Sequence, residues 1–136
     1  MQKRSGRVVA TYLERADQAA ESARRESESG DYNAACNRAY YAIFYAVQGL
    51  LEDAGQEDVG KTHASLLRLF SQRLVLTGEA PADLARALSV AQNLRARADY
   101  TLEGATADNA AEAIAAMNRL LDYARSRLHG SKRSEP

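Results

Sequence analysis

The sequence has too few cysteines, histidines and prolines for internal disulfides, a dedicated zinc site or proline-rich segments. Its 136 residues include one cysteine, two histidines, two prolines and no tryptophan. The single cysteine, Cys36, cannot form an intramolecular disulfide, and two histidines without a cysteine pair do not make a dedicated zinc site. Proline interrupts helices and alanine favours them, so an alanine-rich, proline-poor chain is typical of a helical protein. We expect no metal and no cofactor.

Net charge and long hydrophobic runs are also missing. The 18 Lys and Arg residues balance 18 Asp and Glu residues. The chain as a whole therefore lacks the positive field that concentrates a protein on nucleic acid, although a basic patch on one face stays open. No apolar run approaches the roughly 20 residues that span a bilayer, and no apolar signal region follows Met1–Ser5. We expect a cytoplasmic protein without membrane contact.

Five segments carry apolar residues at steps of three and four, the period of an amphipathic helix. We expect helices at about 8–28, 32–54, 62–76, 81–99 and 107–128. Glycines indicate where four of them stop, at Gly30, Gly55, Gly78 and Gly130. The next helices have start signals in the N-cap residues Asp31 and Thr106 and in Pro81, which suits a first helical turn.

No segment alternates with the period of two that a half-buried strand shows. The predicted fold class is therefore all-α, an antiparallel bundle of four to five helices. We expect residues 1–130 to form a single helical domain and residues 131–136 to be a disordered tail.

The segment 32–54 has two distinct faces. At about 100° per residue, one face collects the side chains expected in the core, which are Cys36, Tyr40, Ile43, Val47, Leu50 and Leu51. The opposite side carries Arg38, Tyr41 and Tyr45. Two interpretations stay open: this stripe packs on another helix or a second subunit, or it lines a cleft in which Arg38 binds an anion and the rings stack on a base.

The segment 81–99 places a charge on its apolar stripe. That stripe is formed by Leu84, Leu88, Ala91 and Ala98, and Arg95 falls in its middle. Arg97 points the opposite way, whereas Asp99 follows Arg95 by one turn and can pair with it. This pair fixes helix packing or forms part of a ligand site.

His63 stands near the start of the segment 62–76, just after Lys61. Exposed N–H groups at a helix start attract anions, and a lysine beside them strengthens the attraction. The same helix end favours a neutral His63, the state that a general base needs. The alternative is that His63 is an ordinary packing residue on an apolar face.

Three motifs in this order resemble the HEPN domain. They are Asn37-Arg38-Ala39-Tyr40-Tyr41-Ala42-Ile43-Phe44, Lys61-Thr62-His63, and Arg95 through Asp99-Tyr100. The likeness extends from about residue 10 to 125. It points to the small stand-alone bacterial and archaeal branch, the UPF0332-like proteins.

The resemblance implies a homodimeric bundle in which the two fourth helices lie near the dimer interface. It also implies a toxin–antitoxin-type system with a minimal nucleotidyltransferase as partner, and RNA or nucleotide as ligand. In active members an arginine holds phosphate, and a histidine that follows after four to six intervening residues moves a proton without metal. Arg95 matches the arginine, but Tyr100, Thr101 and Leu102 stand where the histidine is expected.

The resemblance therefore assigns Arg95, Asp99 and Tyr100 to a catalytic group, and the residues alone assign Arg38, Tyr41, Tyr45, Lys61 and His63 to binding. Tyr100 is also a candidate acceptor of a nucleotidyl group. One hypothesis is a metal-independent endoribonuclease with a degenerate motif. Another is a non-catalytic module that binds nucleotide or protein and dimerises, and a third is a purely structural dimerisation bundle.

Overall fold

A computed structural model describes residues 2–56 and 62–133 of the chain. Those residues form five α-helices and no strand: α1 (Gln2–Glu28), α2 (Tyr32–Asp53), α3 (His63–Phe70), α4 (Asp83–Tyr100) and α5 (Ala107–Arg133). A π-helical segment, η1 (Ser71–Val75), continues from α3. The predicted all-α bundle is confirmed.

Side chains cap the helices at the predicted positions. The Asp31 carboxylate accepts a hydrogen bond from the Ala34 N–H at 3.0 Å and caps α2. Before α5, the Thr106 hydroxyl accepts from the Asn109 N–H at 3.1 Å, and the Asn109 side chain accepts from the Thr106 N–H at 3.0 Å. Both N-cap predictions are confirmed, because these bonds satisfy N–H groups that the first turn leaves without partners.

Some helix ends differ from the prediction. Helix α1 begins at Gln2 and includes Gly6, which a helix interior tolerates. Helix α4 begins at Asp83, so Pro81 precedes it. Helix α5 continues through Gly130 to Arg133, because an interior glycine costs a helix about 1 kcal/mol without ending it. Residues 134–136 lie outside the described part of the chain.

The predicted helix 62–76 is divided into α3 and η1. The Leu76 N–H donates to the carbonyl of Ser71 at 2.8 Å, a bond over five residues. Leu66, Phe70 and Leu74 are all buried. Their spacing of four exceeds the 3.6 residues of an α-helical turn, and the wider π turn keeps all three on the inner side.

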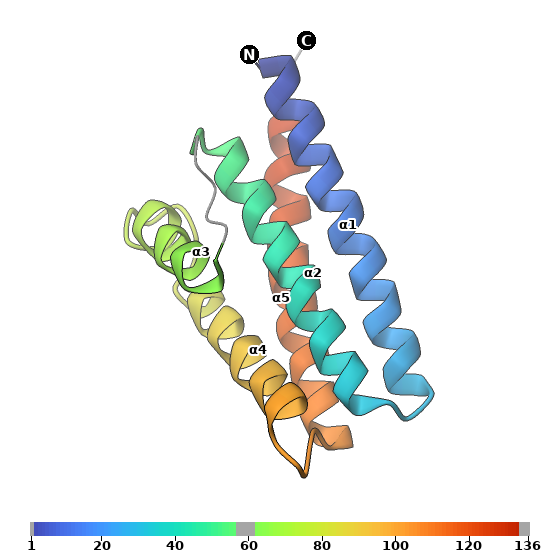
Figure 1. Cartoon of the computed structure of the whole chain (residues 1–136). Helices are drawn as coiled ribbons and strands as arrows, with labels where there is room; N and C mark the ends of the chain where they lie inside the picture. Colours follow the sequence, from blue (N-terminus) through green and yellow to red (C-terminus); the bar gives the residue numbers. More distant parts are fainter. Residues whose placement is uncertain (1, 57–61, 134–136) are drawn as a thin grey trace.

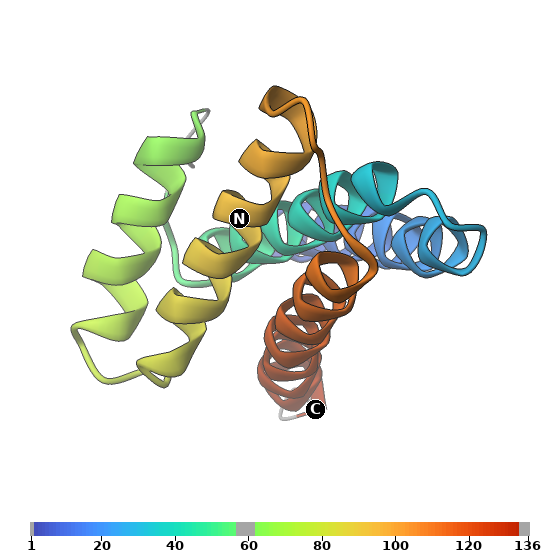
Figure 2. The same ribbon diagram turned by 90° about the horizontal axis from the view of Figure 1, so that it is seen from below.

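Helix α2 lies in the middle of the bundle. In Figure 1, α1 runs beside it, α5 lies behind it, and α3 and α4 stand on its other side. Figure 2 shows that α3 and α4 form a hairpin that is steeply inclined to α1 and α2. The predicted core face of α2 is confirmed, because Cys36, Tyr40, Ile43, Val47, Leu50 and Leu51 are all buried.

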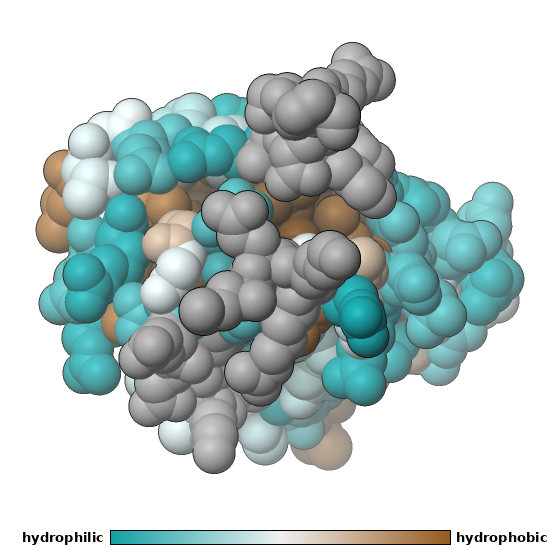
Figure 3. Space-filling view, turned by 90° about the horizontal axis from the view of Figure 1, so that it is seen from above, coloured by the Kyte–Doolittle hydropathy of each residue, from teal (hydrophilic) through white to brown (hydrophobic). Residues whose placement is uncertain are grey.

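Helix α1 starts and α5 ends at the same end of the bundle (Figure 1). Viewed from that end, Figure 3 shows mostly hydrophilic residues at the outline, with hydrophobic residues between them and at the left and lower edges. Among the described residues, no helix is long and apolar enough to cross a membrane.

The loop between α4 and α5 is tied to the first turn of α2. The Asn33 side-chain carbonyl accepts from the Ala105 N–H at 2.7 Å. Gly104 has a φ of +71°, and a Cβ there would lie 2.7 Å from that same Asn33 oxygen. The loop therefore requires glycine both for its conformation and for its approach to Asn33.

We predict that Gly104→Ala lowers the free energy of unfolding by about 2–3 kcal/mol, since it combines left-handed strain with a steric clash. Gly78→Ala is the matched control: its φ is +85°, and no atom lies within 4 Å of an added Cβ. That control should lose only about 1–2 kcal/mol. Urea unfolding measures both, and equal losses would show that the contact with Asn33 is unimportant.

Candidate functional site

Arg95 lies on the inner face of α4, as its position in the sequence predicted. Its neighbours on that face, Leu84, Leu88, Ala91 and Ala98, are buried, and the Arg95 side chain is only 19% exposed. Arg97 faces the α4–α5 loop, where its Nε donates to the Gly104 carbonyl at 3.0 Å. Of the two arginines, Arg95 is the one directed toward α2.

Two tyrosine rings and a carboxylate hold the Arg95 guanidinium. Its central carbon lies 5.2 Å from the ring centroid of Tyr40 and 5.6 Å from that of Tyr41. Its Nε donates to Oδ2 of Asp99 at 3.2 Å, which confirms the predicted pairing along α4. A cation above an aromatic face is attracted to it, more strongly where water is displaced. Arg95 is therefore restricted in orientation.

Asp99 receives a second hydrogen bond from α2. The Asn37 side chain donates to Oδ2 of Asp99 at 3.3 Å. Both bonds reach Oδ2, and Oδ1 accepts none from the described residues. The Asp99 side chain is 26% exposed. Asn37 belongs to the HEPN-like motif, but no sequence pattern assigned it a role, because its contact joins residues 62 positions apart.

The predicted stripe of α2 lies next to this cluster. Tyr41 and Tyr45 are half-buried, with ring centroids 6.3 Å apart. The Arg38 guanidinium lies 5.2 Å from the Tyr41 centroid. Arg38 and Arg95 thus both contact the Tyr41 ring, which joins the stripe of α2 to the charged end of α4.

Of the other predicted site residues, the described structure tests only Tyr100, and no described contact brings it into this cluster. Tyr100 is 76% exposed and makes no hydrogen bond with Arg95 or Asp99. Five residues separate Tyr100 from Arg95, which turns it about 140° around the helix. Lys61 lies outside the described residues. His63 is the first residue of α3, and its side chain is not part of the described structure.

Two buried acids beside the cluster keep their protons. Burial raises the pKa of the Cys36 thiol from 9.0 to about 11, and the negative charge of Asp99 adds to the rise. Burial also raises the pKa of the Tyr40 phenol from 10.0 to about 12, although Arg95 acts in the opposite direction. Both groups are neutral at physiological pH, so the charges here are those of Arg38, Arg95 and Asp99.

Among the described side chains, no three of His, Cys, Asp or Glu gather as a metal site would need.

Comparison with known proteins identifies the family. The model of the HEPN domain matches residues 9–127. The chain belongs to the HEPN family. The crystal structure of ST0689, an archaeal HEPN homologue, superposes with a TM-score of 0.65 at 28% identity, over 88% of this chain and 97% of that one.

Two relatives of this HEPN protein illustrate its branch. A Methanocaldococcus jannaschii protein, named "Putative toxin MJ0142", is 31% identical over 100 residues, covering 74% of this chain and 67% of the relative. The UPF0332 protein glr0978 of Gloeobacter violaceus is 31% identical over 88 residues, covering 65% of this chain and 68% of the relative. The UPF0332-like resemblance is confirmed.

We predict that stability falls in alkali partly through Cys36. Between about pH 9 and pH 11 the unfolded chain loses the thiol proton and the folded chain keeps it. The free energy of unfolding therefore decreases by up to about 1.4 kcal/mol per pH unit from this group. Tyr40 adds a similar decrease between about pH 10 and pH 12.

Cys36→Ala should remove the thiol contribution and give a shallower decrease between pH 9 and pH 10, where Tyr40 contributes least. Urea unfolding at pH 8, 9, 10 and 11 measures the slope. A loss of stability in Cys36→Ala that is the same at every pH would result only from the smaller volume of alanine in the core. Identical slopes for the two proteins would show that the folded thiol titrates normally.

Proposed function

We propose that this HEPN protein is a toxin-type protein that binds RNA through a backbone phosphate at Arg95. The observation that carries the proposal is the placement of Arg95 over Tyr40 and Tyr41, with Asp99 on its Nε. A guanidinium with a fixed plane suits phosphate oxygens, because its donors match their geometry. The relative MJ0142 is named as a toxin, which supports the biological class.

RNA cleavage at this site needs a proton acceptor, and Asp99 is our candidate. Its Oδ2 receives Arg95 and Asn37, while its Oδ1 has no donor among the described residues. In the proposed reaction Oδ1 takes the proton of the ribose 2′-hydroxyl as the 2′-oxygen attacks phosphorus. The bond to the 5′-oxygen breaks, and that oxygen takes a proton from water. Arg95 stabilises the negative charge on the phosphoryl oxygens.

Binding without cleavage uses the same arginine and differs only in what Asp99 does. In that case the carboxylate merely orients Arg95 through the hydrogen bond at 3.2 Å. Tyr100 favours this second function, because it stands where the family motif has a histidine and its side chain is 76% exposed. Separate measurements of binding and cleavage distinguish the two functions.

We predict that Arg95→Met weakens RNA binding about 10–100-fold, since it removes charge-assisted hydrogen bonds to phosphate. Cleavage, where present, should persist in EDTA and fall at least about 100-fold in this variant. Arg86→Met is the matched control: Arg86 is exposed on the same helix and forms no ion pair with a described residue. Fluorescence anisotropy with labelled RNA measures binding, and gel electrophoresis measures cleavage.

Asp99→Asn separates the two roles of the carboxylate. It should abolish cleavage and leave binding within about threefold if Oδ1 is the proton acceptor, because asparagine still accepts a hydrogen bond from Arg95. Equal RNA affinity in the wild type, Arg95→Met and Arg86→Met would contradict an Arg95 phosphate site. If the wild-type protein binds RNA but does not cleave it, the function is binding without cleavage.

Exposed Tyr100 is proposed as the point at which a minimal nucleotidyltransferase partner acts. The phenol oxygen would attack the α-phosphorus of a nucleoside triphosphate, forming a phosphodiester and releasing pyrophosphate. The exposure of 76% supports access by a partner enzyme. A homodimer with the ends of the α4 helices at its interface stays a prediction from the family resemblance.

We predict that Tyr100→Phe prevents nucleotidylation by a minimal nucleotidyltransferase encoded beside the gene. Transfer of label from α-labelled ATP, followed by peptide mass spectrometry, measures the modification. Tyr32→Phe is the control, because Tyr32 is half-buried at the start of α2. Label that stays on the Tyr100→Phe protein would rule out this acceptor.

A further inference from the structure

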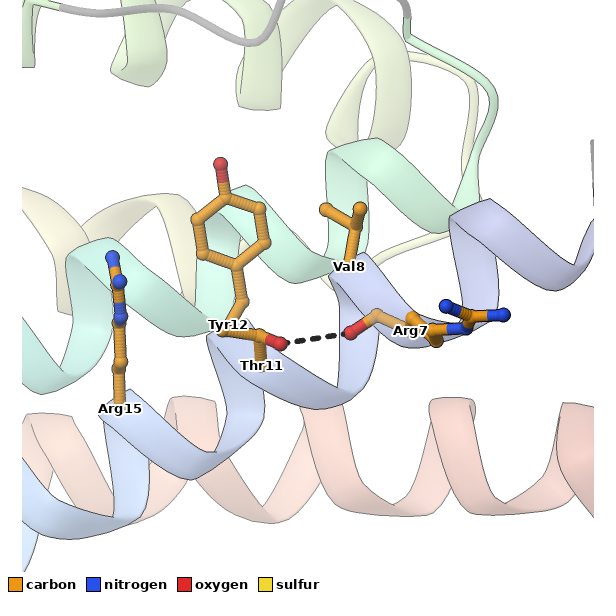
Figure 4. A pocket seen from close by; sticks show the side chains of 5 residues that line it. All are labelled: Arg7, Val8, Thr11, Tyr12 and Arg15. Carbon is orange, nitrogen blue, oxygen red and sulfur yellow. Dashed lines mark hydrogen bonds between the residues drawn. The ribbon is translucent and has the colours of Figure 1, made fainter.

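A surface depression lies on α1, away from Arg95. It has a volume of about 250 Å³ and is lined by Arg7, Val8, Thr11, Tyr12 and Arg15. Figure 4 shows Val8, Tyr12 and Arg15 projecting from the same side of α1, while the Thr11 hydroxyl bonds to the Arg7 carbonyl. No sequence pattern singled out this group.

The depression borders α2 rather than α5. The Asp17 and Arg24 side chains bond to Arg125 and Asn118 of α5, so they mark the flank of α1 that faces α5. Arg15 precedes Asp17 by two residues, about 200° around the helix, and lies on the other flank. The Cβ of Tyr12 lies 3.4 Å from where a Cβ on Gly49 of α2 would stand.

Gly49 links this depression to the stripe of α2. Tyr45 stands one turn before Gly49, and Arg38 two turns before Tyr45, so all three share a flank of α2. Tyr41, which contacts both Arg38 and Arg95, lies one turn before Tyr45. Tyr41 and Tyr45 on α2 and Tyr12 on α1 thus lie between two arginines, Arg95 on α4 and Arg15 on α1.

The two arginines of the α1 depression have no partner among the described residues. The guanidinium groups of Arg7 and Arg15 are exposed and form no hydrogen bond or ion pair with any described residue. Glu14 lies about 100° around the helix from Arg15, whereas it is two turns from Arg7 on the same flank of α1. Arg119, Arg125 and Arg127, by contrast, are each paired with a carboxylate.

We propose that Tyr12 and Arg15, with Arg7 beside them, form an auxiliary site for single-stranded RNA that extends the Arg95 site across α2. The proposal rests on RNA being the ligand at Arg95. Arginines neutralise phosphates, and tyrosine faces stack on unpaired bases whatever their sequence. In a duplex the bases stack on each other and are not available to these rings, so single strands are the class that fits.

RNA length provides the test. A fluorescein-labelled uridine tetramer reaches the Arg95 site alone, whereas a uridine dodecamer also reaches α1. Arg15→Gln and Tyr12→Leu should each weaken dodecamer binding at least about fivefold and leave tetramer binding unchanged. Arg15→Gln should also reduce the salt dependence of dodecamer binding by about 0.7 in log–log slope. Arg25→Gln is the matched control, an exposed arginine on α1 that does not line the depression and lies about 15 Å along the helix from Arg15.

The outcomes separate this proposal from the Arg95 site. Unchanged dodecamer affinity in both α1 variants overturns the auxiliary site, even where Arg95→Met still weakens the tetramer. Weakening by the α1 variants with no effect of Arg95→Met overturns the proposed function and keeps the α1 site as an independent one. A wild type that binds neither RNA, or that binds anionic lipid vesicles instead, overturns both. Thermal unfolding of each variant shows that it is folded.

Discussion

The packing of α2 among α1, α4 and α5 is the constraint from which the rest of the structure follows. More than half of its residues are buried, and those facing α1 are mostly alanine or glycine. Small side chains let two helices approach closely. Only one strip of α2 stays accessible, and it carries Arg38, Tyr41 and Tyr45. Binding residues on this helix can stand nowhere else without weakening the core.

The arrangement around Arg95 balances charge and solvent exposure. A buried arginine is costly unless other groups replace the water that it loses. Here the faces of Tyr40 and Tyr41 and the Asp99 carboxylate provide that replacement, while 19% of the side chain stays exposed. The same groups would hold an arginine in a purely structural role. Among the described residues, Oδ1 of Asp99 and the arginines Arg7 and Arg15 of α1 have no partner, and packing alone does not require such groups.

Much of the bundle could be predicted from the sequence, because helical periodicity and capping are local. The same periodicity distinguished Arg95 from Arg97 and paired Arg95 with Asp99, one turn away. Asn37 and Tyr12 could not be assigned a role, because their contacts join separate helices. Tyr100 was grouped with Arg95 through its place in the motif, whereas the helix turns its side chain elsewhere. The untested roles of Lys61 and His63 stay predictions.

The π segment Ser71–Val75 has a consequence for comparing this chain with its relatives. A π turn holds one residue more than the α-helical turn that would replace it. Loss of a single residue there would leave a continuous α-helix. It would also shift the sequence position of the residues between Leu76 and the start of α4 by one. A one-residue gap in an alignment is therefore best placed between residues 71 and 75, and the order of residues on α4 would still correspond.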